Sequence, residues 1–235
     1  QKASLVTAAA AVGTMLFLAP LLGLLPQAVL AAVVIVYSVG LIQPAEFVAI
    51  RRVRTMEFRW ALAAFAGVLV FGTLKGIVVA IILSMIGLAS QAAHPKVHVI
   101  GRKRGADVLR PLSPEHPDDE TFDGLLILRP EGRLFFANTQ QVSDQIRSLV
   151  ERYQPRVVAL DMSRVFDIEY SALQMLIEGE RRATESGATF WLTDLSPDVM
   201  ESIKASGLAD RLGRARLFFN ARAVIRHYQE NFLAS

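Results

Sequence analysis

The sequence Gly76-Ile-Val-Val-Ala-Ile-Ile-Leu-Ser-Met-Ile-Gly-Leu-Ala-Ser-Gln-Ala-Ala93 contains no Asp, Glu, Lys or Arg, and a charged, mixed sequence begins directly after it with His94-Pro95-Lys96. A helix needs about 20 apolar residues to cross a bilayer core about 30 Å thick, so this run is almost long enough to span a membrane. The residue before a proline is disfavoured in a helix, so we expect the helix to end at His94. The junction separates a membrane region, residues 1–94, from a soluble region.

Three further uncharged runs precede this one: Ala3 to Leu25, Pro26 to Ala45 and Trp60 to Leu74. The first two reach spanning length. The third has 15 residues, and it spans only if Glu57 to Arg59 lie at the interface with the arginine reaching toward water. We therefore predict a multi-domain protein that begins with all-α transmembrane helices, four in number, at about residues 3–25, 27–44, 58–74 and 76–93.

Charge is distributed unevenly along the 235 residues. Residues 1–93 hold six basic and two acidic groups, and the rest of the chain holds 19 basic and 20 acidic groups. A pI near 9.4 can indicate nucleic-acid binding. Here the excess positive charge lies beside the apolar runs, as expected of charges that orient helices at a lipid surface, and we expect no nucleic-acid partner. The absence of cysteine excludes disulfides and Cys-ligated metals.

The basic residues also predict an orientation. The segment from Glu46 to Arg59, expected as a loop, carries four arginines, and Lys96 and Arg102 to Arg104 follow the last apolar run. The positive-inside rule places both segments in the cytoplasm, which predicts a multi-pass protein of the cell (inner) membrane with a cytoplasmic soluble region. No span contains an internal Asp, Glu, His or Arg of the kind that marks an ion pathway, so the helices are expected to be scaffold or gate.

The soluble region reads as a linker followed by one domain. Residues 95–121 are rich in proline and turns, and we expect a linker there with at most one short strand, at Val97 to Ile100. In residues 122–235, apolar strand patterns alternate with helical ones, which predicts an α/β domain with a mostly parallel central sheet flanked by helices. The expected strands are 124–129, 133–137, 156–161, 189–193 and 217–219. The expected helices begin near Asn138 or Thr139, Ser171, Ser196-Pro197 and Asn220.

No enzyme signature is present. The four histidines are scattered and form no metal-binding unit, no phosphate-binding loop occurs, and we expect no metal or cofactor. Asp161 and Asp167 lie at the carboxyl end of a predicted strand, where α/β folds usually bind ligands. Both could equally cap the loop that follows.

Several stretches together resemble a known family. They are Leu25-Pro-Gln-Ala-Val-Leu-Ala-Ala-Val-Val-Ile-Val36, Gly72-Thr-Leu-Lys-Gly-Ile-Val-Val-Ala80, Leu134-Phe-Phe-Ala-Asn138 and Val157-Val-Ala-Leu-Asp-Met-Ser-Arg-Val-Phe-Asp-Ile-Glu-Tyr-Ser-Ala-Leu173. In their order they resemble the C-terminal end of sulfate permease (SulP) anion transporters, whose membrane domain is followed by a cytoplasmic STAS domain. The last stretch is the most specific, because it looks like the STAS pattern of a strand ending in Asp-x-Ser.

The resemblance implies a candidate regulatory or ligand loop formed by Asp161, Asp167, Glu169 and Ser171. Glu169 stands where the family usually has Asp, and Tyr170 replaces a hydroxyl residue. Ser171 falls where related anti-sigma-factor antagonists take phosphate, at a helix N-terminus, although a packed, helix-capping serine is the alternative.

The resemblance also implies a function. The four spans would be the eleventh to fourteenth helices of an inverted-repeat transporter, mostly its gate, and the anion site would lie before Gln1 in a longer protein. That protein would carry out secondary active transport of inorganic anions, sulfate or a related anion, and would contact membrane lipid and form a homodimer. The alternative is a membrane-anchored STAS signalling module that binds a protein partner or nucleotide and transports nothing.

Overall fold

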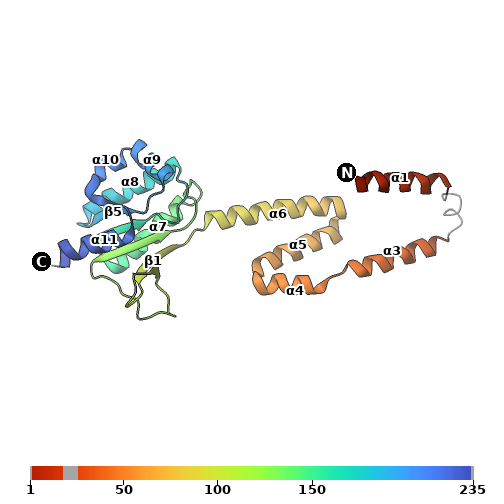
Figure 1. Cartoon of the computed structure of the whole chain (residues 1–235), viewed down its shortest axis with the longest axis horizontal. Coiled ribbons are helices and arrows are strands. Elements are labelled where there is room, and N and C mark those ends of the chain that lie inside the picture. Colours follow the sequence, from red (N-terminus) through yellow and green to blue (C-terminus); the bar gives the residue numbers. More distant parts are fainter. Residues whose placement is uncertain (1, 18–25, 234–235) are drawn as a thin grey trace. The chain divides into compact units, whose positions relative to one another are not determined.

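The structure is a computed structural model that describes residues 2–17 and 26–233, and it divides into two units, Gln1–Leu83 and Ser84–Ser235. The described part of the first unit is helical (Figure 1). Its helices are α1 (Lys2–Phe17), α3 (Gln27–Leu41), α4 (Pro44–Val53), α5 (Thr55–Phe71) and α6 (Thr73–Ala93), of which the last continues into the second unit.

Proline and glycine set several of these helix boundaries. Pro44 occupies the first turn of α4, where its missing N–H costs no helical hydrogen bond. Gly72 joins α5 to α6 with a φ of 80°, a conformation that favours glycine. The two helices then pack closely, because a Cβ atom added to Gly76 would lie 2.5 Å from the Cα atom of Val68. A larger residue at position 76 would push the hairpin apart.

The structure agrees with the four predicted spans in part. Helices α3, α5 and α6 overlap three of them, and α1 covers the first as far as Phe17, beyond which residues 18–25 lie outside the described part. Two helical stretches there are long and apolar enough to cross a bilayer, Gln27–Val53 and Thr73–Ala93, and Ala3–Phe17 is a shorter apolar helix. Four transmembrane helices therefore remain a prediction. The segment from Glu46 to Arg59 is mostly helical rather than a loop.

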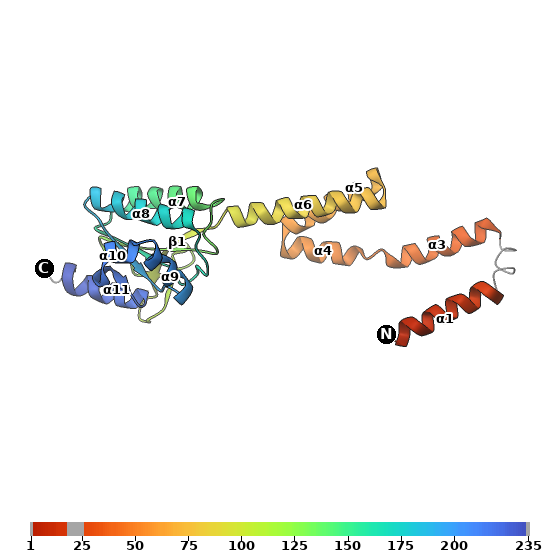
Figure 2. The ribbon, with the colours of Figure 1, turned by 90° about the horizontal axis from the view of Figure 1, so that it is seen from above.

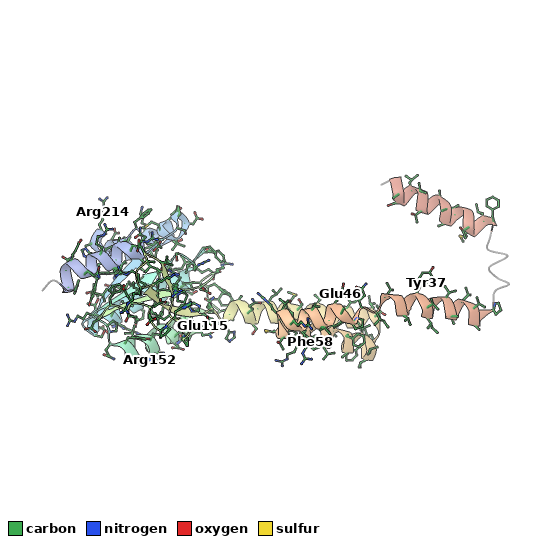
Figure 3. All side chains as sticks on the ribbon, turned by 60° about the horizontal axis from the view of Figure 1, so that its bottom comes forward. Tyr37, Glu46, Phe58, Glu115, Arg152 and Arg214 are labelled. Atoms are coloured by element: carbon green, nitrogen blue, oxygen red, sulfur yellow. The ribbon has the colours of Figure 1, made fainter. Side chains whose placement is uncertain are left out.

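The helices of the first unit expose their apolar side chains. In α3, none of the residues is buried, and Tyr37 projects from the helix with 75% of its surface exposed (Figure 3). In the described helices α4 and α5, Gly67 is the single buried residue. Such apolar, outward-facing surfaces are typical of helices that contact lipid or other membrane helices.

The second unit contains a six-stranded mixed sheet in the order β2-β1-β3-β4-β5-β6. Strands β3 to β6 run parallel, and β1 is antiparallel to both of its neighbours. The strands are β1 (Val97–Arg102), β2 (Leu109–Pro111), β3 (Leu125–Pro130), β4 (Val157–Asp161), β5 (Thr189–Thr193) and β6 (Leu217–Phe218). The helices are α7 (Thr139–Tyr153), α8 (Tyr170–Glu185), α9 (Pro197–Ala205), α10 (Leu208–Leu212) and α11 (Ala221–Tyr228), with short turns of other helix types at Arg214–Arg216 and Gln229–Leu233.

Side chains alternate between the two faces of the sheet, as the period of a strand requires. In β4, Val158 and Leu160 belong to a core under α7 and α8, whereas Val157 and Ala159 belong to a second core under α11. Figure 2 shows α7 and α8 together on one face and α11 on the other. The predicted α/β architecture with helices flanking a sheet is thus confirmed for this unit.

Two predictions about the strands of this unit were wrong. The predicted linker 95–121 contributes two strands, β1 and β2, to the sheet, where at most one was expected. The predicted strand 133–137 is a turn in which Leu134 alone pairs, in an isolated bridge with Ile168. By contrast, Ser196 and Asn220 cap α9 and α11 as predicted, because their side-chain oxygens accept hydrogen bonds from Val199 N and Ala223 N.

Candidate regulatory site at the carboxyl edge of the sheet

A buried ion pair joins the carboxyl ends of β3 and β4. The Nε and Nη2 atoms of Arg129 donate to Oδ2 of Asp161 at 2.8 and 2.6 Å. The Asp161 side chain is 1% exposed and that of Arg129 is 14% exposed. The second oxygen of Asp161, Oδ1, accepts a hydrogen bond from the backbone N–H of Ser163 at 2.9 Å. Both oxygens of the Asp161 carboxylate therefore accept hydrogen bonds, one from a buried cation and one from the loop that follows β4.

Asp194 lies at the end of β5 beside this pair. Its Oδ2 atom accepts hydrogen bonds from Thr193 Oγ1 at 3.1 Å and from the Ala221 N–H at 2.8 Å, which ties β5 to the start of α11. Its backbone has a φ of 57°, a left-handed value that is uncommon outside glycine. Burial, and then the negative charge of Asp161, raise the pKa of Asp194 above its ordinary value.

A second, exposed cluster forms around Arg133. Its Nε atom lies 2.7 Å from Oδ2 of Asp167, and its Nη2 atom lies 2.8 Å from Oε1 of Glu169. The two segments that carry these residues are paired by their backbones, because Leu134 N donates to Asp167 O and Glu169 N donates to Leu134 O. The structure thus brings Asp167 and Glu169 together on one arginine, while Asp161 is engaged by another.

Ser171 is the second residue of α8, whose N-cap is Glu169. Its Oγ atom is buried and has no hydrogen-bond partner among the described residues. The first N–H groups of a helix have no partner within the helix, and they favour nearby negative charge. Phosphorylation of Ser171 would therefore require its Oγ atom to move out of this buried position.

Sequence reasoning missed the residues that hold these acids in place. Asp194 follows a predicted strand in the same way as Asp161, so the same strand-end signal could have found it. Arg129 and Arg133 lie at the facing ends of the predicted strands 124–129 and 133–137, and no local pattern pairs them with acids 32 to 36 residues away. Within residues 2–17 and 26–233, no cluster of three or more histidine or acidic residues could hold a metal ion.

Two amide side chains, one at the N-cap of α7 and one within that helix, connect this edge to the end of α6. Asn138, which is fully buried, donates through Nδ2 to Ala92 O at 3.1 Å and to Arg133 O at 2.8 Å. Gln145 donates to Pro95 O at 2.9 Å and accepts from Val97 N at 3.1 Å. Asn138 was expected to cap α7, but its Oδ1 atom accepts from Phe135 N instead. These bonds fix the segment that leaves α6 against the domain.

Both halves of the chain match known protein families. Residues 1–64 match the sulfate permease family, and residues 116–223 match the STAS domain. The two matches, in this order within one chain, support its assignment to the membrane-embedded sulfate permease family with a STAS domain. The resemblance seen in the sequence is confirmed.

Relatives in this family support the assignment over almost the whole chain. The chain is 27% identical to a probable sulfate transporter of Mycobacterium tuberculosis over 97% of its own length and 41% of that protein. It is 26% identical to the high affinity sulfate transporter 2 of Stylosanthes hamata, over 92% of this chain and 34% of that protein. The chain therefore spans between about a third and two fifths of the length of these relatives.

A solved structure shares the fold. The murine Solute Carrier 26 family member A9 anion transporter, in its inward-facing state, matches 81% of this chain with a TM-score of 0.69, and the match covers 31% of that protein. The sequence identity is 17%, so this likeness shows the fold alone.

Proposed function

We propose that this chain is the C-terminal part of a secondary active transporter that moves inorganic anions, sulfate or a related anion, across the cell (inner) membrane. The observation that carries the proposal is the match of the N-terminal helices to the sulfate permease family, followed in the same chain by a STAS domain. The relatives named above are sulfate transporters by name.

The helices of the first unit would serve as gate rather than as the anion site. α3 contains no charged residue. The charged groups of α4 and α5 lie near helix ends: Glu46, Arg51 and Arg52 in α4, and Glu57 and Arg59 in the first turns of α5. A transported anion needs polar groups near the bilayer midplane, such as free helix N-termini. The anion would bind in a part of the transporter that this chain, which spans about a third to two fifths of its relatives' length, does not include.

The STAS domain would be cytoplasmic and would regulate transport through α6. Support for this role comes from the bonds of Asn138 and Gln145 to the segment that leaves α6, because a movement of α7 would be passed directly to Ala92 and Pro95. The candidate regulatory loop adjoins the same point, since Asn138 also holds the carbonyl of Arg133. We expect the transporter to contact membrane lipid and to form a homodimer with a second copy of itself.

The test is transport by reconstituted protein. The full-length parent in liposomes should take up sulfate above empty vesicles, and a chain limited to residues 1–235 should not. In the parent, Asn138→Ala with Gln145→Ala should reduce uptake several-fold at unchanged protein content, whereas Gln140→Ala, on the exposed side of α7, should leave it unchanged. A parent that moves no anion at all would favour a membrane-anchored STAS module instead.

A further inference from the structure

A few large apolar side chains of the STAS domain are strongly exposed, and most of them are aromatic. Among the described residues that follow α6, four aromatic residues are between 65% and 91% exposed: Phe136, Phe166, Tyr170 and Phe219. Two others, Val108 and Tyr153, are about half exposed. Aromatic rings are large apolar groups, and a cluster of them facing water is unusual unless the surface binds something.

The four aromatic residues all follow the carboxyl ends of parallel strands. Phe136 comes after β3, and its segment is hydrogen-bonded to the segment after β4 that carries Phe166, as the bond from Leu134 N to Asp167 O shows. Tyr170 opens α8 directly after that segment. Phe219 follows β6, next to Ala221, whose N–H is bonded to Asp194 at the end of β5. We call these four residues the aromatic edge.

The aromatic edge lies where α6 enters the domain. Phe136 is two residues before Asn138, whose side chain is bonded to Ala92 O in the last turn of α6. β1 begins at Val97 and pairs antiparallel with β3, opposite Pro130, so the chain arrives from α6 at this same edge of the sheet. The remaining strands follow at spacings of about 4.8 Å, so the aromatic edge is about 15 Å long from β3 to β6.

The occupant that fits this surface is a phospholipid headgroup layer. After Lys75, the helix α6 carries no charged residue up to its end at Ala93, so its end marks the boundary between hydrocarbon and headgroups. Tyrosine is enriched at that boundary because its ring is apolar and its hydroxyl is polar. Phenylalanine is among the residues that interfacial segments bury at the boundary between headgroups and acyl chains. Arg164 is exposed between Asp161 and Phe166, where a cation suits lipid phosphates. We propose that the aromatic edge of the STAS domain rests in the headgroup region of the bilayer that α6 crosses.

The lack of cysteine makes a direct test possible. Single substitutions Phe136→Cys, Phe166→Cys and Phe219→Cys in the full chain, each carrying a nitroxide label, would be placed in phosphatidylcholine–phosphatidylglycerol nanodiscs. Paramagnetic relaxation by oxygen, which concentrates in lipid, and by a water-soluble nickel chelate would then be compared for each label. We expect the ratio of oxygen to nickel accessibility to be several-fold higher at the aromatic edge than at Tyr153→Cys.

Tyr153 is the matched control, because it is an exposed aromatic residue at the other end of α7. Fifteen helical residues place it about 22 Å from the start of that helix. Leu88→Cys on α6 is the lipid-facing reference. Nickel accessibility at the aromatic edge equal to that at Tyr153→Cys would overturn the proposal. Protection from both reagents would also overturn it, because the edge would then be covered by protein, such as a second copy of the chain.

A second variant tests the contribution of the rings themselves. With the label at Phe219→Cys, the added substitutions Phe136→Ser, Phe166→Ser and Tyr170→Ser should raise nickel accessibility several-fold, because the edge would lose most of its apolar contact with the bilayer. All three side chains are exposed, so the domain should stay folded, and fluorescence of the buried Trp191 checks this. An unchanged accessibility at position 219 with a folded domain would contradict a lipid-binding role for these rings.

Discussion

The two arginine clusters at the carboxyl edge of the sheet differ in burial more than in chemistry. Arg129 and Asp161 are almost completely shielded from water, whereas Arg133, Asp167 and Glu169 are between about a third and a half exposed. The short N–O distances are nearly the same in both clusters, 2.6 to 2.8 Å. Geometry alone therefore does not tell a structural ion pair from one that can rearrange.

Burial decides what each cluster can do. A buried ion that loses its partner cannot be compensated by water, so the Arg129–Asp161 pair is locked into the fold. An exposed ion pair contributes little because water competes for both partners, so the groups around Arg133 can separate at small cost. The exposed cluster is the one suited to respond to a ligand, a modification or a lipid surface.

The largest effect is expected from Asp161→Ala, which leaves Arg129 buried without a counter-ion. We expect the free energy of unfolding of the STAS domain to fall by about 3–5 kcal/mol. Urea unfolding of the full chain in detergent would be followed by the fluorescence of Trp191, with Trp60→Phe in every variant so that one tryptophan reports. Arg129→Ala should cost a similar amount. A loss below about 1 kcal/mol would mean that the buried pair behaves like an exposed one.

A smaller effect of opposite sign is expected from Asp194→Asn. Because the pKa of Asp194 is raised by burial and by Asp161, the folded state disfavours the ionised form. The wild-type domain therefore loses stability as the pH rises from below the ordinary Asp value through the raised pKa, and the neutral amide does not. The Asn variant can still accept the bond from Ala221 N.

We expect Asp194→Asn to unfold at a higher urea concentration than wild type at pH 7, with the difference disappearing at low pH, where Asp194 is protonated. Asp194→Ala is the control, because it removes both the charge and the acceptor for Ala221 N. An Asn variant that is less stable than wild type at pH 7 would show that Asp194 is favourably ionised beside Arg129.

Arg133→Ala should change stability by less than about 1 kcal/mol, because its two partners can be solvated. It is the matched counterpart of Arg129→Ala, since both remove one arginine that bonds carboxylates at the same edge. The same urea measurement would compare them directly. If Arg133→Ala cost as much as Arg129→Ala, exposure would not separate the two clusters.

Much of the fold could be predicted because its signals are local. The alternation of strand and helix patterns and the caps at Ser196 and Asn220 are confirmed. The linker prediction failed because β1 and β2 are short and lie among prolines and turns, and they are held by pairing with each other and with β3 rather than by an apolar run. The expected strand 133–137 failed because the buried side chain of Asn138 holds that segment as a turn.

The candidate site could be predicted only in part. Strand-end and family patterns pointed to four residues, of which Asp167 and Glu169 share one arginine. The arginines themselves could not be assigned, because a long, flexible cation can reach many acids and the sequence gives no measure of burial. The bonds of Asn138 and Gln145 to the segment after α6 were equally hidden, since they join residues 46 to 50 positions apart.

The smallest effect is expected from Glu178→Gln, on the exposed face of α8. Hydrogen bonds from Arg181 and then Arg182 lower the pKa of Glu178 to about 2. Because the lowered pKa belongs to the folded state, the carboxylate stabilises the domain above about pH 4.5, and this contribution is lost as the pH falls toward 2. Water screens an exposed helical pair, so the loss in thermal midpoint at pH 7 should be about one or two degrees despite the large pKa shift. Circular dichroism melts at pH 7 and pH 2.5 would measure it, with the two proteins converging at the lower pH. A loss comparable to that of Asp161→Ala would mean that the number of charged hydrogen bonds, rather than burial, sets the value of an ion pair in this domain.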